Sequence, residues 1–246
     1  MKKTLHSVLV TCALKTDQYH RAAECGASLG LIDLEDSVPL GQKENARRLA
    51  LPFLAGQQGD GYLHALRINS VLTQEGMRDL LALRDSGTMP DAVLLPKVES
   101  PDEIGTLEAL LGRRFEQVGI LPIIESPGGI CAVDEIARVS PRIWGLIFGA
   151  ADFSSAMGTT QAWDNMVYAR SRIVAAARRA GVQAIDSPCF DLHHEETVWT
   201  ESERARDLGF QGKIAIHPKH VPVLNQVFSG TVAGTWPGLA GGELPF

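Results

Sequence analysis

Residues 143–154 read IWGLIFGAADFS, an apolar run followed by three small residues and an aspartate. The run 143–148 is apolar on both faces, which is typical of a parallel strand covered by helices. Asp152 follows after Gly-Ala-Ala, three residues with little or no side chain. We therefore expect its carboxylate at the mouth of a sheet, where backbone and ligand can approach closely. There it either takes part in chemistry or caps the next helix.

The same alternation of apolar runs and helical segments recurs along the whole chain. The segment 161–180 carries an apolar stripe and ends at Gly181, a typical C-cap, whereas Pro52 should kink the helix predicted around 46–54 or end it early. Eight strands that alternate with helices predict a single (β/α)₈ TIM barrel, with the barrel domain over 1–228 and an irregular tail over 229–246. The predicted strands cover about 7–13, 29–35, 63–68, 92–95, 118–124, 143–149, 182–186 and 213–216.

The amino-acid composition argues against nucleic acid and membranes as binding partners. A formal net charge of −6 argues against nucleic acid as the main partner, although a local basic patch could still bind a phosphate. No apolar stretch reaches the ~18 residues that a membrane-spanning helix needs. The four cysteines lie far apart without a CxxC pair, which favours reduced thiols and a cytoplasmic protein.

Two carboxylates follow neighbouring predicted strands at matching depth. Glu125 comes directly after the fifth apolar run, and Asp152 follows the sixth. Carboxylates without a histidine or cysteine nearby suit Mg²⁺, which takes one or two protein carboxylates and completes its octahedron with water and substrate oxygens. We predict that Glu125 and Asp152 bind Mg²⁺. The alternative is that Asp152 caps a helix and Glu125 pairs with a basic neighbour.

Charged residues also follow the second, third and fourth strands. Arg67 is placed to clamp a substrate carboxylate or enolate, or to pair with a carboxylate of the second strand, and the two roles are compatible. One of Glu35 and Asp36 should face the mouth while the other pairs with a cation, because side chains alternate along a strand. Lys97 either contacts substrate or pairs with such a carboxylate. These four residues are the candidate catalytic set.

Small residues before Asp152 suggest a second binding element. Gly149, Ala150 and Ala151 could offer backbone N–H groups to an anionic substrate oxygen, or could simply form a tight turn. The neighbouring His193 and His194 would diverge on any regular element, so we place them in a surface loop rather than in a metal site.

Together the motifs resemble the citrate lyase beta subunit family, which includes malyl-CoA and citramalyl-CoA lyases and belongs to the HpcH/HpaI superfamily of pyruvate-linked class II aldolases. The resemblance runs from about residue 5 to 228. It implies a TIM barrel, a Mg²⁺ ion held by Glu125 and Asp152, Arg67 on the substrate's carboxylate or enolate, and Asp36 close to the site. The matching motifs are DLEDSV (33–38), LRIN (66–69), LPKVES (95–100), IIESPGG (123–129), FGAADF (148–153) and GFQGKIAIHP (209–218).

Family members open with a Val-Pro-Gly-type loop and an arginine that helps bind the thioester carrier, whereas this sequence has VTCALK at 10–15. The resemblance therefore leaves three functions open. They are a Mg²⁺-dependent lyase for a β-hydroxyacyl thioester on coenzyme A or another carrier, a pyruvate aldolase for free hydroxy-keto acids, and a lyase subunit active only within a complex. Apolar residues in the tail, among them Trp236 and Phe246, suggest that it docks on a neighbouring subunit and that the protein is a homo-oligomer.

Overall fold

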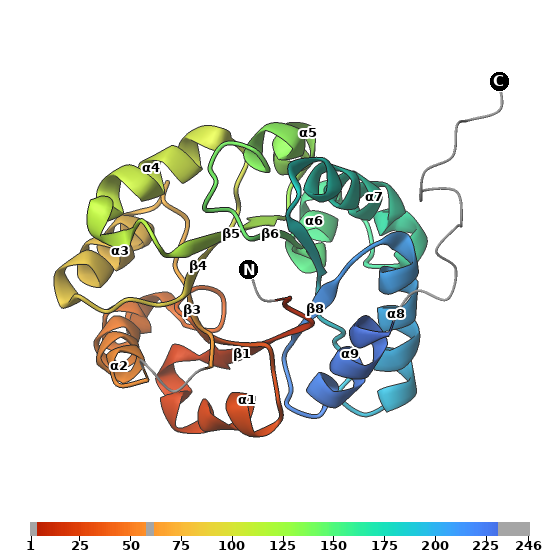
Figure 1. The fold of residues 1–246 in the computed structure, drawn as a ribbon, viewed down its shortest axis with the longest axis horizontal. Coiled ribbons are helices and arrows are strands. Elements are labelled where there is room, and N and C mark those ends of the chain that lie inside the picture. Colours follow the sequence, from red (N-terminus) through yellow and green to blue (C-terminus); the bar gives the residue numbers. More distant parts are fainter. Residues whose placement is uncertain (1–3, 58–61, 231–246) are drawn as a thin grey trace, which may run out of the picture.

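The computed structural model describes residues 4–57 and 62–230. Eight parallel strands close into one barrel in the order β1 to β8, and the helices form a ring outside it (Figure 1). The predicted (β/α)₈ barrel is therefore confirmed. The strands are β1 (Ser7–Cys12), β2 (Leu29–Asp33), β3 (His64–Arg67), β4 (Ala92–Leu95), β5 (Gly119–Ile124), β6 (Gly145–Phe148), β7 (Gln183–Asp186) and β8 (Gly212–Ala215).

The helices follow the strands, as a barrel of right-handed crossovers requires. The α-helices of the described residues are α1 (His20–Glu24), α2 (Lys43–Ala55), α3 (Gln74–Ser86), α4 (Pro101–Leu111), α5 (Pro127–Ile136), α6 (Ala150–Met157), α7 (Trp163–Ala180), α8 (Glu195–Leu208) and α9 (His220–Ser229). The prediction for α7 is confirmed, and Gly181 adopts the left-handed conformation of its cap. Pro52 does not end α2 early, since the helix continues to Ala55; a proline so near the C-terminus removes one hydrogen bond from the last turn only.

Alternating side chains divide the apolar residues between two cores. In β4, Ala92 and Leu94 belong to the core inside the barrel, whereas Val93 and Leu95 belong to the core between barrel and helices. The same alternation places Leu31, Ile123 and Ile147 inside. Each strand therefore has a defined inward set of positions, and the last inward position of a strand faces the mouth.

No helix within the described ranges is long and apolar enough to cross a membrane. The predicted tail lies outside these ranges from residue 231 on, so the division at 228 and the docking of the tail stay predictions.

Candidate active site

Strand register brings four polar or small residues into one layer at the C-terminal mouth. Two positions beyond the inward Leu31, Ala65, Ile123 and Ile147 lie Asp33, Arg67, Glu125 and Gly149. Asp33 and Arg67 are paired positions of β2 and β3. Ile123 pairs with Ile147 across β5 and β6, which places Glu125 next to Gly149. The barrel geometry itself thus assembles the site.

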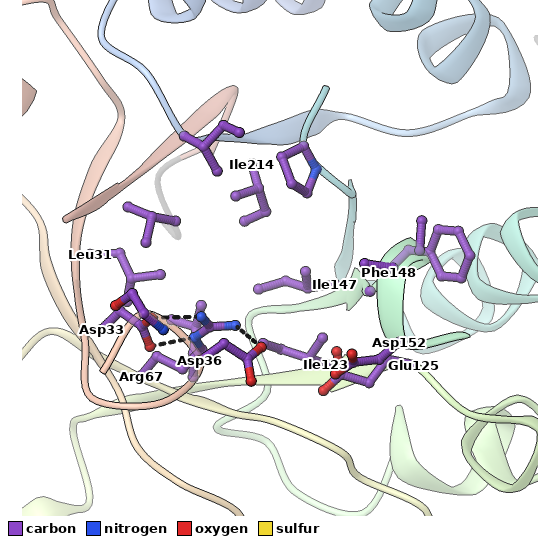
Figure 2. A pocket seen from close by; sticks show the side chains of 18 of the residues that line it. Leu31, Asp33, Asp36, Arg67, Ile123, Glu125, Ile147, Phe148, Asp152 and Ile214 are labelled. Carbon is purple, nitrogen blue, oxygen red and sulfur yellow. Dashed lines mark hydrogen bonds and ion pairs between the residues drawn. The ribbon is translucent and has the colours of Figure 1, made fainter. Parts of the chain in front are cut away.

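These residues line a cavity of about 390 Å³ that opens at the mouth. Figure 2 shows Asp33, Asp36 and Arg67 on one side of it and Glu125 with Asp152 on another. Its floor is formed by inward aliphatic side chains of several strands, among them Leu31, Leu94, Ile123, Ile147 and Ile214. A ligand here meets charged groups at the rim and an apolar floor below.

Arg67 is fixed by Asp33. Its Nε donates to Asp33 Oδ1 at 2.6 Å and its Nη2 donates to Asp33 Oδ2 at 2.7 Å. Burial alone would raise the pKa of Asp33, but the hydrogen bonds and charge of Arg67 outweigh burial and hold this pKa below its usual range. The pKa of Arg67 is raised by the same pairing although burial opposes it. The sequence-based prediction of an ion pair with a strand-two carboxylate is therefore confirmed, and Asp33 is that carboxylate.

The division of roles that we expected for Glu35 and Asp36 holds in part, because Asp36 lines the cavity and the buried Glu35 pairs with cations, but Asp36 lies near the same cations as well. Strand β2 ends at Asp33, so strand alternation no longer applies two residues later, and both carboxylates contact the same two cations. Arg67 Nη1 lies 3.1 Å from Glu35 Oε2 and 3.6 Å from Asp36 Oδ2. Lys97 Nζ contacts Glu35 Oε1 and lies 3.5 Å from Asp36 Oδ1. Glu35 is buried, while the Asp36 side chain is 56% exposed and lines the cavity.

Lys43 supports this loop from below. Its Nζ donates to the carbonyl oxygens of Leu34 and Glu35, both at 2.7 Å. Because these bonds go to the backbone, Lys43 fixes the course of the chain between Asp33 and Asp36 rather than neutralising one carboxylate.

Glu125 is a buried carboxylate in an acidic environment. Its Oε1 accepts a hydrogen bond of 2.8 Å from the backbone N–H of Lys97. Burial, together with the charges of Glu35 and Asp152, raises its pKa to about 8. Gly149 leaves the space that this side chain fills, because a Cβ at position 149 would overlap Glu125 Oε2. The glycine therefore makes room for the carboxylate.

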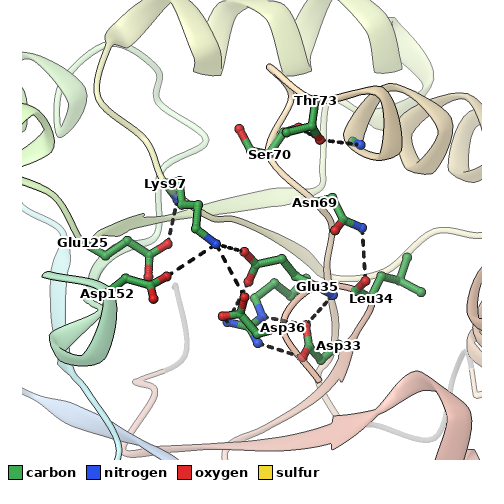
Figure 3. A network of polar contacts seen from close by, with 12 residues as sticks. Asp33, Leu34, Glu35, Asp36, Asn69, Ser70, Thr73, Lys97, Glu125 and Asp152 are labelled. Carbon is green, nitrogen blue, oxygen red and sulfur yellow. Dashed lines mark hydrogen bonds and ion pairs between the residues drawn. The ribbon is translucent and has the colours of Figure 1, made fainter. Parts of the chain in front are cut away.

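Asp152 lies beside Glu125, in the first turn of α6, and both side chains face Lys97 (Figure 3). A carboxylate is stabilised there by the helix dipole. Asp152 is not the N-cap, which is Gly149, and no side-chain hydrogen bond caps this helix. Its Oδ2 is buried and has no hydrogen-bond partner within the described residues; Lys97 Nζ lies 3.4 Å away.

The donor set fits a hard divalent cation. Acidic side chains outnumber basic ones at the mouth, where Asp33, Glu35, Asp36, Glu125 and Asp152 surround Arg67 and Lys97. No group of three or more His, Cys, Asp or Glu side chains in residues 4–57 and 62–230 is arranged to hold a metal ion. A cation at Glu125 and Asp152 must therefore complete its coordination with water and ligand oxygens, as Mg²⁺ usually does.

The stretch 149–151 lines the cavity as predicted, but its backbone is used unevenly. The N–H of Gly149 donates to Ile124 O at 3.1 Å and is therefore part of the sheet. Ala150 and Ala151 begin α6, where N–H groups have no acceptor within the helix, so these two are the donors left for an anion. The histidines at 193 and 194 lie exposed in the loop before α8, as expected.

The structure contains a second polar cluster that the sequence did not predict. Between barrel and helices, Asp186 of β7 accepts hydrogen bonds from Lys213 Nζ at 2.7 Å and from Arg170 Nε at 2.8 Å. All three side chains are buried. The strand register pairs Asp186 with Lys213, a signal that becomes visible only once β7 and β8 are aligned.

A closed (β/α)₈ barrel with charged groups converging on its C-terminal mouth is the usual architecture of a barrel enzyme. Comparison with known proteins identifies the family. The model of the HpcH/HpaI aldolase/citrate lyase family matches residues 12–218. The chain belongs to this family, whose members are carbon–carbon lyases.

Two curated relatives and one solved structure illustrate the similarity. The citrate lyase subunit beta of Escherichia coli is 33% identical over 210 residues, covering 82% of this chain and 69% of that protein. The L-malyl-CoA/beta-methylmalyl-CoA lyase of Rhodobacter capsulatus is 33% identical over 239 residues, covering 86% and 74%. The citrate lyase beta subunit of M. tuberculosis, in complex with oxaloacetate and magnesium, superposes with a TM-score of 0.80 at 27% identity, covering 93% of this chain and 99% of that one.

Proposed function

We propose that the protein is a Mg²⁺-dependent lyase that cleaves or forms a β-hydroxyacyl thioester such as malyl-CoA or citramalyl-CoA, with an α-keto acid and an acyl thioester as the other partners. The observation that carries the proposal is the arrangement of the mouth. The carboxylates of Glu125 and Asp152 share one cavity with an arginine that Asp33 holds in place. The magnesium and oxaloacetate of the M. tuberculosis relative and the activity named for the Rhodobacter relative support it.

Glu125 and Asp152 are the residues that would hold the cation. When bound, a divalent cation supplies Lewis-acid stabilisation of the oxygens of an α-hydroxy or α-keto acid. Groups of the protein itself bind and orient the substrate. Arg67 presents a fixed positive charge to the carboxylate or the enolate, and the N–H groups of Ala150 and Ala151, at the start of α6 and beside the cavity, would donate to an anionic oxygen.

The two carboxylates after β2 receive different roles in this proposal. Glu35 is buried against Arg67 and Lys97 and orients both cations. Asp36 lines the cavity, is half exposed and stands apart from the Glu125–Asp152 pair, so we assign to it the contact with the reacting hydroxyl, whose proton must leave during cleavage.

The other two functions left open by the sequence are outcomes of one experiment. Single-turnover cleavage is measured with the full chain against malyl-CoA, citramalyl-CoA and free hydroxy-keto acids, each with Mg²⁺ and with EDTA. We expect Mg²⁺-dependent release of an α-keto acid from a thioester. Turnover of the free acids alone would identify an aldolase, and no turnover of any of them would indicate a subunit that needs partners.

The proposal also covers the oligomeric state of the protein and the carrier of the acyl group. We propose a homo-oligomer on the basis of the apolar residues in the tail, and coenzyme A as the carrier on the basis of the activity named for the Rhodobacter relative. Light scattering and a comparison of coenzyme A thioesters with thioesters of a shorter pantetheine arm test the two points independently of the metal.

A further inference from the structure

Lys97 has an unusual backbone conformation. Among the described residues other than glycine it is the one with positive φ, at 57°. This left-handed region is costly for a residue with a Cβ, and such strain concentrates at functional sites. Here the conformation directs the Lys97 N–H to Glu125 Oε1, which leaves the other oxygen of that carboxylate beside Gly149. Glycine would adopt the same backbone conformation without strain, so the strain points to a role for the lysine side chain.

The side chain of Lys97 joins two groups of carboxylates (Figure 3). On one side its ammonium contacts Glu35 and lies 3.5 Å from Asp36. On the other it lies 3.4 Å from the buried Oδ2 of Asp152, the oxygen without a hydrogen-bond partner. The ammonium thus stands against one of the two carboxylates that the proposed function assigns to a divalent cation.

Two cations on one carboxylate oxygen repel each other strongly, because the site is partly buried and its effective dielectric constant is low. The Asp152 contact is at ion-pair distance without a hydrogen bond, whereas the contact with Glu35 is a hydrogen bond. The weaker of the two attachments is therefore the one that faces the cation site.

We propose that the Lys97 ammonium is a built-in counter-ion of the metal site, one that competes with the divalent cation for Asp152. Binding of the cation displaces the ammonium from Asp152, and Glu35 with Asp36 retains it beside the cavity. Lys97 is then a positioning residue in two respects. Its N–H orients Glu125, and its ammonium keeps the metal-free cluster of carboxylates from repelling itself. This inference rests on the proposed function, because it takes Glu125 and Asp152 as the cation ligands.

The experiment titrates Mg²⁺ alone into the metal-free full chain and measures affinity by calorimetry. We expect Lys97→Met and Lys97→Gly to bind Mg²⁺ about tenfold more tightly than wild type or better, because each removes the competing charge. Lys97→Arg keeps the charge and should stay within about threefold of wild type. Lys219→Met removes an exposed positive charge elsewhere, from the loop after β8, and should leave the affinity unchanged.

A second readout is the melting temperature of the metal-free protein. It should fall in Lys97→Met, where the carboxylates lose their counter-ion, and saturating Mg²⁺ should raise it by more than it does in wild type. Lys97→Gly relieves the backbone strain as well, so its metal-free protein should melt higher than Lys97→Met.

Equal or weaker Mg²⁺ binding by Lys97→Met and Lys97→Gly would overturn the inference while leaving the metal site intact. Absence of Mg²⁺ binding in wild type would remove the proposed metal site and the inference together. The two failures are therefore distinguished by the wild-type titration.

Discussion

Arg67 and Asp33 form a two-point ion pair between the last residues of neighbouring strands, and the Asp33 side chain is fully buried beneath it. The guanidinium that the sequence suggested as a substrate clamp thus uses its Nε and Nη2 for the protein. Its Nη1 faces Glu35 and Asp36. Arg67 therefore offers substrate a positive charge of fixed position, and Asp33 fixes it.

Replacing Arg67 with lysine keeps the charge but loses the two-point pairing. The lysine would lose one of the two charge-assisted hydrogen bonds to Asp33, each of which contributes roughly 1.5–3 kcal/mol, and its positive charge would no longer be held in place. We therefore expect kcat/KM for the thioester to fall by about tenfold to a hundredfold. Asp33→Asn should lower kcat/KM in the same direction, because it leaves the arginine unanchored. Steady-state kinetics of both variants measure this, and an unchanged kcat/KM in Arg67→Lys would assign the residue a structural role only.

Gly149→Ala tests the space reserved for Glu125. The φ of Gly149 is −102°, which alanine adopts, so the effect should come from the overlap of the new Cβ with the Glu125 carboxylate. We expect Mg²⁺ affinity to fall at least tenfold and the free energy of unfolding to fall by about 1–3 kcal/mol, the usual effect of overpacking. Gly105→Ala is the matched control, because a Cβ there meets open space in α4. Wild-type Mg²⁺ affinity in Gly149→Ala would contradict this account of the glycine.

The buried cluster around Asp186 should govern stability rather than activity. Removing one cation with Lys213→Met leaves Arg170 as the positive charge paired with the buried carboxylate, and we expect a loss of about 3–5 kcal/mol in the free energy of unfolding. Asp85→Asn, which breaks an exposed pair with Arg84, should cost less than about 1 kcal/mol. Denaturant unfolding compares the variants, and equal losses in both would contradict the assignment.

The same cluster predicts a dependence on acid. Burial would raise the pKa of Asp186, but the charges of Lys213 and Arg170 outweigh it and hold this pKa below its usual 3.8. A depressed carboxylate pKa contributes stability that is present above the unfolded value and lost as pH falls through the folded one. Unfolding measured from about pH 5 down to about pH 2 should therefore show a shallower loss in Asp186→Asn than in wild type. Parallel pH curves for the two proteins would refute the link.

How much the sequence could predict depended on whether local pattern or tertiary pairing decided the feature. Runs of apolar residues between helical stripes predicted the barrel, and each predicted strand matches an observed one to within about two residues. The family also followed from motifs in order. Both are properties of short segments, which the sequence displays directly.

The site was less visible because register and strand ends decide it. The second strand was expected to reach residue 35, but it stops at Asp33, and this removed the basis for giving Glu35 and Asp36 opposite directions. Asp33 received no role because its partner lies 34 positions away in sequence. The role of Gly149 depends on Glu125, which the register of β5 against β6 places next to it. The sequence around residue 149 does not reveal this register.

The most direct test of the central claim is the affinity of Mg²⁺ for three proteins, measured by calorimetry on wild type, Glu125→Gln and Asp152→Asn. Each substitution keeps the shape of the side chain and removes one charged ligand, so circular dichroism should show an intact fold. We predict measurable binding to wild type and at least a hundredfold weaker binding to both variants, because hard cations require carboxylate oxygens. Equal Mg²⁺ affinity in all three proteins would contradict the assignment of Glu125 and Asp152 as the cation site.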